Sequence, residues 1–246
     1  MSPTLILIRH AQALHNVAQD YSIADPPLSD LGRAQCAELS LALQEKLPKD
    51  LASNIGLIIS SAMRRTCETT VLSLGFLIEK GIPIEAHAGW QENSAKPCDT
   101  GSPIPVIAAE FPQIDFSKVD PVYPDKTSPA GAKYKYKKAN LIARAQSDLE
   151  ELYHRPEKVI VVVSHSGFMR QAVTGDHYFN ADFRVYDIEE RNDPSGPFKL
   201  KQWDLTKGTG GMGRSFDEIV DIGIGLPDEE LPPGVDIELP PNVKPN

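Results

Sequence analysis

The chain has 246 residues, of which 41% are hydrophobic and 24% are charged. This composition is typical of a globular protein and excludes a collagen-like chain, a coiled coil and wholesale disorder. The 25 basic and 34 acidic side chains give a formal net charge of −9, which argues against a protein whose main task is to bind nucleic acid or an anionic membrane. A small anionic substrate is compatible with this balance, because a single pocket can be locally positive.

Targeting and redox signals point to the cytoplasm. The apolar run at residues 5–8 is too short for the core of a signal peptide, and no stretch approaches the roughly 20 apolar residues that would span a membrane. The three cysteines form no CxxC pair, so neither a disulfide framework nor a zinc knuckle is indicated. We therefore expect a cytoplasmic protein that uses no metal or other cofactor.

Short apolar runs alternate with helical patterns along the chain. Strands are predicted at residues 4–9, 56–60, 82–86 and 158–164. Helices are predicted at residues 28–47, 63–78, 132–154 and from about 167, the first with Ser29 as a candidate cap. The alternation at residues 198–205 predicts an edge strand. This order predicts an α/β three-layer sandwich with a mostly parallel central sheet flanked by helices.

Two segments depart from this alternation. Residues 93–130 have no periodicity and contain seven prolines, which predicts an insertion on the surface of the domain, of the kind that often shapes a pocket. The end of the chain is rich in Gly, Pro and acidic residues. We therefore predict one α/β domain at residues 1–205 with this insertion, followed by a tail at residues 206–246.

Charged and imidazole side chains follow the predicted strands. The first strand runs into Arg9 and His10, and Arg64 follows the second. Glu92 follows the third strand, and His165 follows the strongest one. Because the carboxyl ends of parallel strands open on the same edge of a sheet, we expect these side chains to meet there.

Two imidazoles, two guanidiniums and one carboxyl group at one sheet edge suit the transfer of a phosphoryl group. That reaction depends on alignment and charge stabilisation more than on bond-making by the protein. A neutral histidine attacks the phosphorus, while cations balance the charge on the phosphoryl oxygens. A carboxyl group that stays protonated gives its proton to the leaving alkoxide. Protein cations can take the part that a metal plays in other phosphoryl-transfer sites.

Four segments carry a resemblance to a known family. They are LIRHAQALHN at residues 7–16, PLSDLGRAQ at 27–35, SSAMRRTCETT at 60–70 and VVSHSGFMRQ at 162–171. In this order they resemble the four signatures of the histidine phosphatase superfamily, also called phosphoglycerate mutase-like, and they cover the chain from about residue 5 to residue 172. The resemblance implies that His10 is phosphorylated during turnover, that Glu92 is the acid, and that the transferring phosphate is bound by Arg9, Arg64, His165 and Asn16.

The chain departs from the family pattern at two positions, with Ala11 and Ser166 where the family usually has glycine. Alanine still permits a tight turn if φ stays negative. The Ser166 hydroxyl would either bind the phosphate or cap the next helix. The longer segment around the acid in mutase-type members is absent, which argues against mutase activity. Residues 89–102 and 180–184 resemble a fungal subgroup of broad or uncharacterised phosphatases.

Several residues leave two interpretations open. Arg64 and Arg65 are adjacent on a predicted helix, so only one of them can face the phosphate, and the family register favours Arg64. Asp99 is an alternative to Glu92 as the acid, and otherwise a candidate contact for the substrate. His15 is expected near the pocket mouth, at the surface or behind the residues that contact substrate. The cluster KYKYKK at residues 133–138 fits a polyanion site, although such a cluster is more often a solvated helix face.

The sequence therefore predicts a metal-independent phosphomonoesterase that acts through a phosphohistidine on a small phosphorylated metabolite. Residues 93–130 and 176–191 are the segments expected to set its specificity. Within enzymes, the alternatives are a phosphomutase and a recruited pocket that acts on a carboxylated, non-phosphorylated substrate. The alternative outside enzymes is a non-catalytic phosphate-binding protein.

Overall fold

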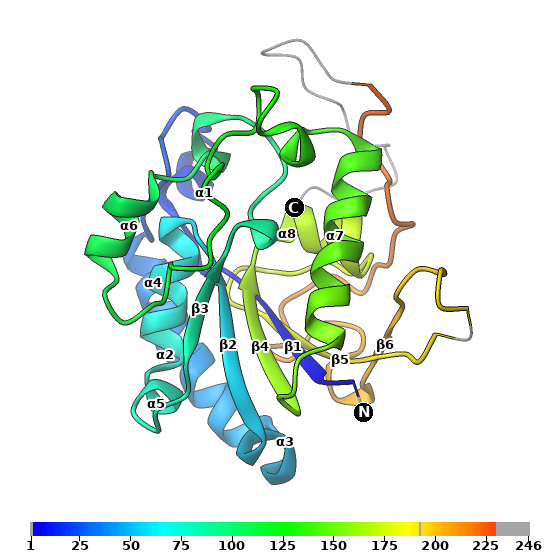
Figure 1. Cartoon of the computed structure of the whole chain (residues 1–246). Coiled ribbons are helices and arrows are strands. Elements are labelled where there is room, and N and C mark those ends of the chain that lie inside the picture. The colour runs from blue at the N-terminus through cyan, green and yellow to red at the C-terminus, as the bar shows by residue number, and fades with distance from the viewer. Residues whose placement is uncertain (1, 192, 230–246) are drawn as a thin grey trace.

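A six-stranded sheet forms the centre of the computed structural model, which describes residues 2–191 and 193–229 (Figure 1). The strand order is β3-β2-β4-β1-β5-β6. Four strands are parallel to one another: β1 (Thr4–Arg9), β2 (Ile55–Ser61), β3 (Ile84–His87) and β4 (Val159–Ser164). The antiparallel strands β5 (Phe183–Ile188) and β6 (Leu200–Gln202) complete one edge. This mixed, mostly parallel sheet confirms the predicted α/β class.

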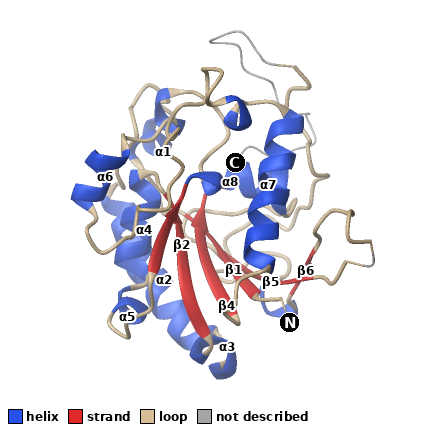
Figure 2. Cartoon of the chain, in the orientation of Figure 1, coloured by secondary structure: helices blue, strands red, loops and turns tan. Residues whose placement is uncertain are grey.

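Helices cover both faces of the sheet, which gives three layers (Figure 2). One face carries α2 (Asp30–Lys46), α3 (Lys49–Ser53), α4 (Arg64–Ser73) and α5 (Gly75–Ile78). The other carries α7 (Lys138–Tyr153), α8 (Ser166–Phe168) and a π-helical turn at Met169–Val173. Along β1, Ile6 and Ile8 pack into the first core and Leu5 and Leu7 into the second. Burial on both faces explains why the strand is apolar at every one of these positions.

The helices on the first face begin close to where the sequence predicts them. The Ser29 hydroxyl accepts a hydrogen bond from the Gly32 N–H at 3.0 Å, so Ser29 is the N-cap of α2. The predicted helix 63–78 divides into α4 and α5 at Leu74. The break comes directly before Gly75, a residue type that disfavours a helix interior.

On the second face the helices are shorter than predicted. The predicted helix 132–154 begins only at Lys138, because Ala132–Tyr134 forms a separate 3-10 turn. The helix expected from about residue 167 is one turn of α8 followed by the π-helical turn. Both differences concern helix boundaries, and the predicted strands and helices occur in the predicted order, although the structure contains further short elements that were not predicted.

The strand β5 was not predicted. Its sequence is buried along nearly its whole length, but Arg184 interrupts the apolar run. The Arg184 guanidinium is buried because it donates to backbone carbonyl oxygens of His177, Thr206 and Gly208. A buried arginine satisfied by distant backbone groups cannot be recognised in a single sequence. The predicted edge strand at residues 198–205 is present, but only Leu200–Gln202 pairs with β5.

The insertion at residues 93–130 packs against the domain. It contains a 3-10 turn at Pro97–Asp99 and α6 (Ile104–Glu110), which lies beside α4 in Figure 1. Asp115 pairs with β3, since its N–H donates to the Ile84 carbonyl oxygen at 2.9 Å. Buried apolar side chains join the insertion to the first core: Ile107, Ile114, Phe116, Val119 and Tyr123. The short helix α1 (Leu14–Ala18) follows β1 and lies at the end of the sheet where β1 ends.

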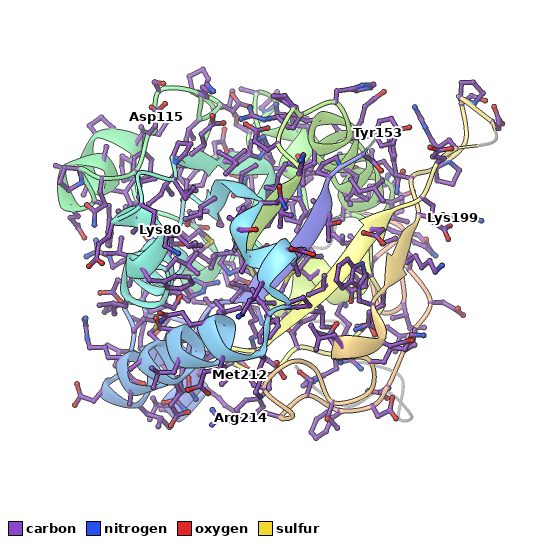
Figure 3. The ribbon with its side chains drawn as sticks, turned by 90° about the horizontal axis from the view of Figure 1, so that it is seen from below. Lys80, Asp115, Tyr153, Lys199, Met212 and Arg214 are labelled. Atoms are coloured by element: carbon purple, nitrogen blue, oxygen red, sulfur yellow. The ribbon has the colours of Figure 1, made fainter. Side chains whose placement is uncertain are left out.

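Residues 207–229 fold back over the domain. Figure 3, seen from below, shows Met212 and Arg214 beside α2, and Arg214 Nη2 lies 2.6 Å from Glu38 Oε2 of that helix. Met212 packs against the first core. The predicted tail 206–246 is thus packed as far as residue 229, and its remainder lies outside the described residues. No helix in the described part of the chain is both long and apolar enough to cross a membrane.

Candidate active site

A pocket of about 380 Å3 opens at the carboxyl edge of the parallel strands. His10 directly follows β1 and His165 directly follows β4, and their ring centroids lie 5.2 Å apart. The two strands are adjacent, with Arg9 in register with Ser164. This register brings the two predicted histidines together. In Figure 1, α8 marks this edge of the sheet directly beyond β4.

His10 is held as a neutral imidazole with a defined tautomer. Arg65 Nε can only donate, and it lies 3.2 Å from His10 Nε2, so this nitrogen carries the lone pair. The proton of the neutral ring is therefore on Nδ1, which lies 2.7 Å from the Ala11 carbonyl oxygen. Burial, followed by the charges of Arg65 and Arg9, lowers the pKa of His10 well below its ordinary value. The ring is uncharged at neutral pH.

His165 is equally buried, and one of its nitrogens has no partner. Its Nε2 lies 2.9 Å from the Ser61 hydroxyl oxygen. Its Nδ1 is buried and makes no hydrogen bond within the described residues. Burial, followed by the charge of Arg65, lowers the pKa of His165 well below its ordinary value. If the Ser61 hydroxyl donates to Nε2, the neutral ring has its N–H at Nδ1.

Arg65, and not Arg64, reaches the histidines. The Arg65 side chain is 1% exposed, and its Nη1 donates to the Cys98 carbonyl oxygen at 2.6 Å. Arg64 Nη1 lies 2.8 Å from Glu110 Oε2, and its side chain is 27% exposed. The predicted position of Arg64 in the site is therefore wrong. The helix α4 begins at Arg64, and a helical step of about 100° turns one of two adjacent side chains away from the pocket.

Arg9 and Ser166 line the pocket and share one acceptor. Arg9 Nη1 donates to the Tyr178 carbonyl oxygen at 2.7 Å, and the Ser166 hydroxyl donates to the same oxygen at 3.3 Å. Burial lowers the pKa of Arg9 to about 10, so its guanidinium stays charged at neutral pH. The Arg9 Nε atom is buried and has no hydrogen-bond partner in the described chain. The structure thus places a fixed cation beside His10, as predicted for Arg9.

Asn16 and His15 of α1 form another wall. Asn16 Nδ2 lies 3.0 Å from His15 Nε2, and Asn16 Oδ1 accepts from the Ala13 N–H at 3.0 Å. Both residues line the pocket, and the His15 ring centroid is 6.0 Å from that of His10. Burial, followed by the charge of Arg65, lowers the pKa of His15 to about 3. His15 is thus a buried neutral neighbour of His10, closer to the centre than the sequence predicted.

Glu92 faces the pocket from the segment that follows the 3-10 turn Ala88–Trp90. Its Oε1 accepts from the Phe168 N–H at 2.8 Å and its Oε2 from the Gly167 N–H at 3.2 Å. A Cβ at Gly167 would lie 2.6 Å from Oε1, so the close approach of the carboxyl group requires glycine there. Burial, followed by the charge of Asp99, raises the pKa of Glu92. The raised pKa favours the protonated form, which a general acid needs, although the backbone N–H donors stabilise the carboxylate.

Asp99 lines the pocket and forms an ion pair with Arg65. Its Oδ1 lies 3.3 Å from Arg65 Nη2, and its Oδ2 accepts from the Ser94 hydroxyl at 2.6 Å. Asp99 therefore holds the Arg65 guanidinium in place, a contact that the sequence did not predict.

Lys126 is a buried residue of the site that the sequence analysis missed. Its side chain comes from the insertion, and its Nζ donates to the backbone carbonyl oxygens of Glu92 at 2.7 Å, Ser94 at 2.9 Å and Asp99 at 2.5 Å. The residue is 3% exposed, and burial lowers its pKa to about 7. The surrounding sequence, PDKTSP, has no periodicity that could have indicated burial.

Within the described residues, no group of three or more His, Cys, Asp or Glu side chains is placed to hold a metal ion. One member of the predicted cluster at residues 133–138, Tyr136, lines this pocket. The cluster at residues 133–138 forms ion pairs with acidic side chains of the same chain. Lys133 Nζ lies 2.5 Å from Asp120 Oδ2, and Lys137 Nζ lies 2.9 Å from Glu229 Oε2.

The fold and the pocket define an α/β protein with two adjacent buried histidines in a pocket at the carboxyl edge of its sheet. A family model described as histidine phosphatase superfamily (branch 1) matches residues 5–182. The chain belongs to this superfamily, which places it among the histidine-type phosphatases. The family resemblance of the four sequence segments is confirmed, whereas the likeness of residues 89–102 and 180–184 to a fungal subgroup stays a prediction.

Named relatives agree with this assignment. Phosphoglycerate mutase-like protein 1 of Arabidopsis thaliana is 28% identical over 197 residues, which cover 68% of this chain and 69% of the relative. A second Arabidopsis thaliana phosphoglycerate mutase-like protein is 29% identical over 202 residues, which cover 68% of this chain and 72% of the relative. The ecdysone phosphate phosphatase of Bombyx mori has the same fold, with a TM-score of 0.52 and 14% identity over 80% of this chain and 98% of that structure.

Proposed function

We propose that this chain is a phosphomonoesterase that transfers the phosphoryl group of a small phosphorylated metabolite first to His10 and then to water. The observation that carries the proposal is the environment of His10. Its imidazole is buried and neutral, and its Nε2 lone pair lies 3.2 Å from the Arg65 guanidinium. A second neutral histidine lies beside it, and a carboxyl group of raised pKa lines the same pocket.

In the first step His10 Nε2 attacks the phosphorus, and the bond from phosphorus to the leaving oxygen breaks. The lowered pKa keeps His10 unprotonated, so the lone pair is available at neutral pH. The Ala11 carbonyl oxygen at Nδ1 fixes the ring and stabilises the positive charge that develops on it. A phosphoryl oxygen takes over the Arg65 N–H that otherwise donates to His10.

The remaining phosphoryl oxygens have hydrogen-bond donors at the bottom of the same pocket. Two buried nitrogen atoms have no hydrogen-bond partner among the described residues: Nε of the Arg9 guanidinium and Nδ1 of His165. A phosphoryl oxygen would satisfy each of them, which removes the free-energy cost of a buried unpaired donor. Asn16 adds a neutral donor at the pocket wall, and the Ser166 hydroxyl becomes another if it turns from the Tyr178 carbonyl oxygen to the phosphate.

Glu92 handles the proton. In its protonated form it gives a proton to the leaving oxygen, which departs as an alcohol. The resulting carboxylate then accepts a proton from the water that attacks the phosphohistidine, which releases inorganic phosphate and restores His10. The raised pKa of Glu92 favours the protonated form needed for the first step.

The volume of the pocket bears on the size of the substrate, and the free cysteines bear on the compartment. A pocket of about 380 Å3 lies near the lower end of small-molecule sites and suits a compact metabolite. The three cysteines are all free and buried, which suits a reducing compartment, and we place the reaction in the cytoplasm. Nucleic acid and membranes are not expected partners of this acidic chain.

The test is phosphate release from aryl, sugar and small-acid phosphate esters in the presence of a chelator. We expect wild-type protein to release phosphate and His10→Ala to lose at least about 10³-fold of that rate. The exposed residue His154 supplies the matched control, and His154→Ala should keep full activity. Acid-quenched wild-type protein should carry acid-labile phosphate on His10. Activity retained in folded His10→Ala would exclude the mechanism, and no release from any ester would exclude the function.

A further inference from the structure

A second cavity lies outside the candidate active site. It has a volume of about 400 Å3 and is bounded by α7, by the 3-10 turn Ala88–Trp90 and by the insertion. None of its lining residues lines the pocket that contains His10. The cavity is within the size range of small-molecule sites.

Most of the charged groups that line this cavity are already paired. Lys133 pairs with Asp120 at 2.5 Å, and Lys118 pairs with Glu85 at 2.7 Å. The His87 Nε2 atom lies 3.0 Å from Glu151 Oε2. Within each pair the opposite charges neutralise each other, so these groups do not by themselves require a ligand.

Asp148 is one of two exceptions. The residue is 6% exposed, and its buried Oδ2 atom has no hydrogen-bond partner in the described part of the chain. Its nearest basic neighbour is His87, whose Nδ1 lies 3.9 Å from Oδ1 and accepts from the Gly89 N–H. Burial raises the pKa of Asp148 to about 6, so the carboxyl group still ionises at neutral pH. A Cβ at Gly89 would lie 2.0 Å from Asp148 Oδ1, so glycine makes room for this carboxyl group.

Arg144 is the other exception, and it lies one helical turn before Asp148 on α7. It is 6% exposed, its Nη2 donates to the Gln91 carbonyl oxygen at 2.9 Å and to Asn93 Oδ1 at 3.3 Å, and its guanidinium lies over the Phe168 ring, 4.0 Å from the centroid. Its Nε and Nη1 atoms are buried and have no partner among the described residues. No ion pair within 4.0 Å joins Arg144 to Asp148 in that part of the chain, so the cavity is lined by a guanidinium and a carboxyl group with unsatisfied atoms.

We propose that this cavity binds a small zwitterion that carries an ammonium and a carboxylate, as a free α-amino acid does. The ammonium pairs with Asp148, and the carboxylate pairs with Arg144. Each contact removes the cost of a buried, unpaired group, which is larger for charged groups than for neutral ones. An anion alone would leave Asp148 unpaired, and a cation alone would leave Arg144 unpaired. This proposal does not depend on the phosphatase reaction.

The probe is L-alanine, titrated into the whole protein by calorimetry at pH 7.5. Propionate lacks its ammonium and ethylamine lacks its carboxylate, so the three compounds separate the two contacts. We expect saturable binding of L-alanine and at least about tenfold weaker binding of either single-charge compound, because one charged hydrogen-bonded contact is lost. His10→Ala should bind L-alanine as tightly as wild type does, which separates this site from the candidate active site.

Two variants test the location. Asp148→Asn keeps the shape of the side chain and should weaken L-alanine binding at least about tenfold. Ala143→Leu fills the cavity from an exposed position of α7 and should abolish binding without disturbing the core. Glu150→Gln, an exposed change on the same helix, should bind like wild type. The proposal is overturned if wild type does not bind L-alanine, if both cavity variants bind it unchanged, or if inorganic phosphate displaces it.

Discussion

The base and the rim of the candidate active site are built in different ways. The base consists of Arg9 at the end of β1, His10 and His165 directly after β1 and β4, and Arg65 in the first turn of α4, the helix that follows β2. The rim comes from the insertion, from the segment after β1 that carries His15 and Asn16, from Tyr136, and from Gly225 of the C-terminal segment. Strand register brings the two histidines of the base together, whereas the rim depends on contacts between distant parts of the chain. The base is accordingly the part expected to withstand changes elsewhere, and the rim is the part that contacts outside the pocket can alter.

Glu92→Gln tests the group that connects base and rim, and it has the largest expected effect. The amide cannot donate an acidic proton, so turnover of alkyl phosphates should fall about 10³-fold, with a much smaller loss for aryl phosphates whose leaving groups need no proton. Steady-state rates on paired alkyl and aryl esters measure this difference. The exposed Glu79→Gln is the control. Equal losses for both ester classes would show that Glu92 is not the acid.

Two adjacent arginines allow a sharp test of the base. Arg65→Ala removes a donor from the reacting group and should lower kcat/KM about 10²-fold or more. Arg64→Ala removes only the pair with Glu110 and should stay within about twofold of wild type, as is usual for a partly exposed ion pair. Rates on one aryl ester are sufficient. The opposite order of effects would restore the family register that favours Arg64.

Lys126→Met tests the rim through the backbone that carries Glu92. The variant loses three hydrogen bonds to carbonyl oxygens, and we expect alkyl phosphate turnover to fall about tenfold, less than the 10² that a 1 Å displacement of a reacting group can cost. Lys118→Met, from an exposed lysine of the same insertion, is the control.

The same variant has a pH signature. Besides Asp99 and Arg65, the charge of Lys126 acts on Glu92 and lowers its pKa. Without that charge the pKa of Glu92 rises further, so the alkaline decline of kcat should move to higher pH in Lys126→Met. If kcat falls at every pH but its alkaline decline stays at the same pH, the role of Lys126 is purely structural.

Lys126 also affects stability in a defined pH window. Its pKa is about 7 in the folded protein and 10.5 when unperturbed, so between these values the unfolded chain binds more protons than the folded chain. Stability therefore receives a contribution that increases with pH across this window. Denaturant unfolding between pH 7 and pH 10 should show a flatter pH dependence in Lys126→Met than in Lys118→Met.

Ser215→Ala tests the C-terminal support of the base and has the smallest expected effect. The Ser215 hydroxyl donates to Asp182 Oδ2 at 2.7 Å and accepts from the Phe179 N–H at 2.9 Å. Its loss should cost about 1–2 kcal/mol of unfolding free energy, a decrease of several degrees in Tm for a chain of this size. The exposed Ser195→Ala should leave Tm unchanged. An unchanged Tm in Ser215→Ala would show that the segment adds nothing to the stability of the base.

The sequence predicts the base well because strand ends are encoded locally. The apolar runs at residues 4–9 and 158–164 fix where His10 and His165 emerge, and Glu92 is placed by the strand before it. The choice between Arg64 and Arg65 could not be made from spacing, because it depends on the residue at which α4 begins. A shift of one residue turns a helical side chain by about 100°.

The rim could not be predicted, because its key contacts are not periodic. Lys126 lies 34 residues from Glu92 and binds backbone oxygens, so no side-chain pattern marks the pair. Residues 176–191 were expected to set specificity, yet none of them lines the pocket. They support the base instead: the Asn180 amide donates to the His10 carbonyl oxygen at 3.2 Å, and the Arg9 N–H donates to that of Asp182 at 3.1 Å.

The buried carboxylate of Asp182 has a consequence for synthesis on the ribosome. It accepts hydrogen bonds from Met212 and Ser215, and Ser215 is 33 residues further along the chain. At about 5–20 residues per second, these partners are made roughly 2–7 s after Asp182 itself. During that interval the nascent chain already contains both histidines, while the turn that holds the His10 backbone lacks its partners. The turn that supports the His10 backbone can therefore gain these hydrogen bonds only after Ser215 has been made.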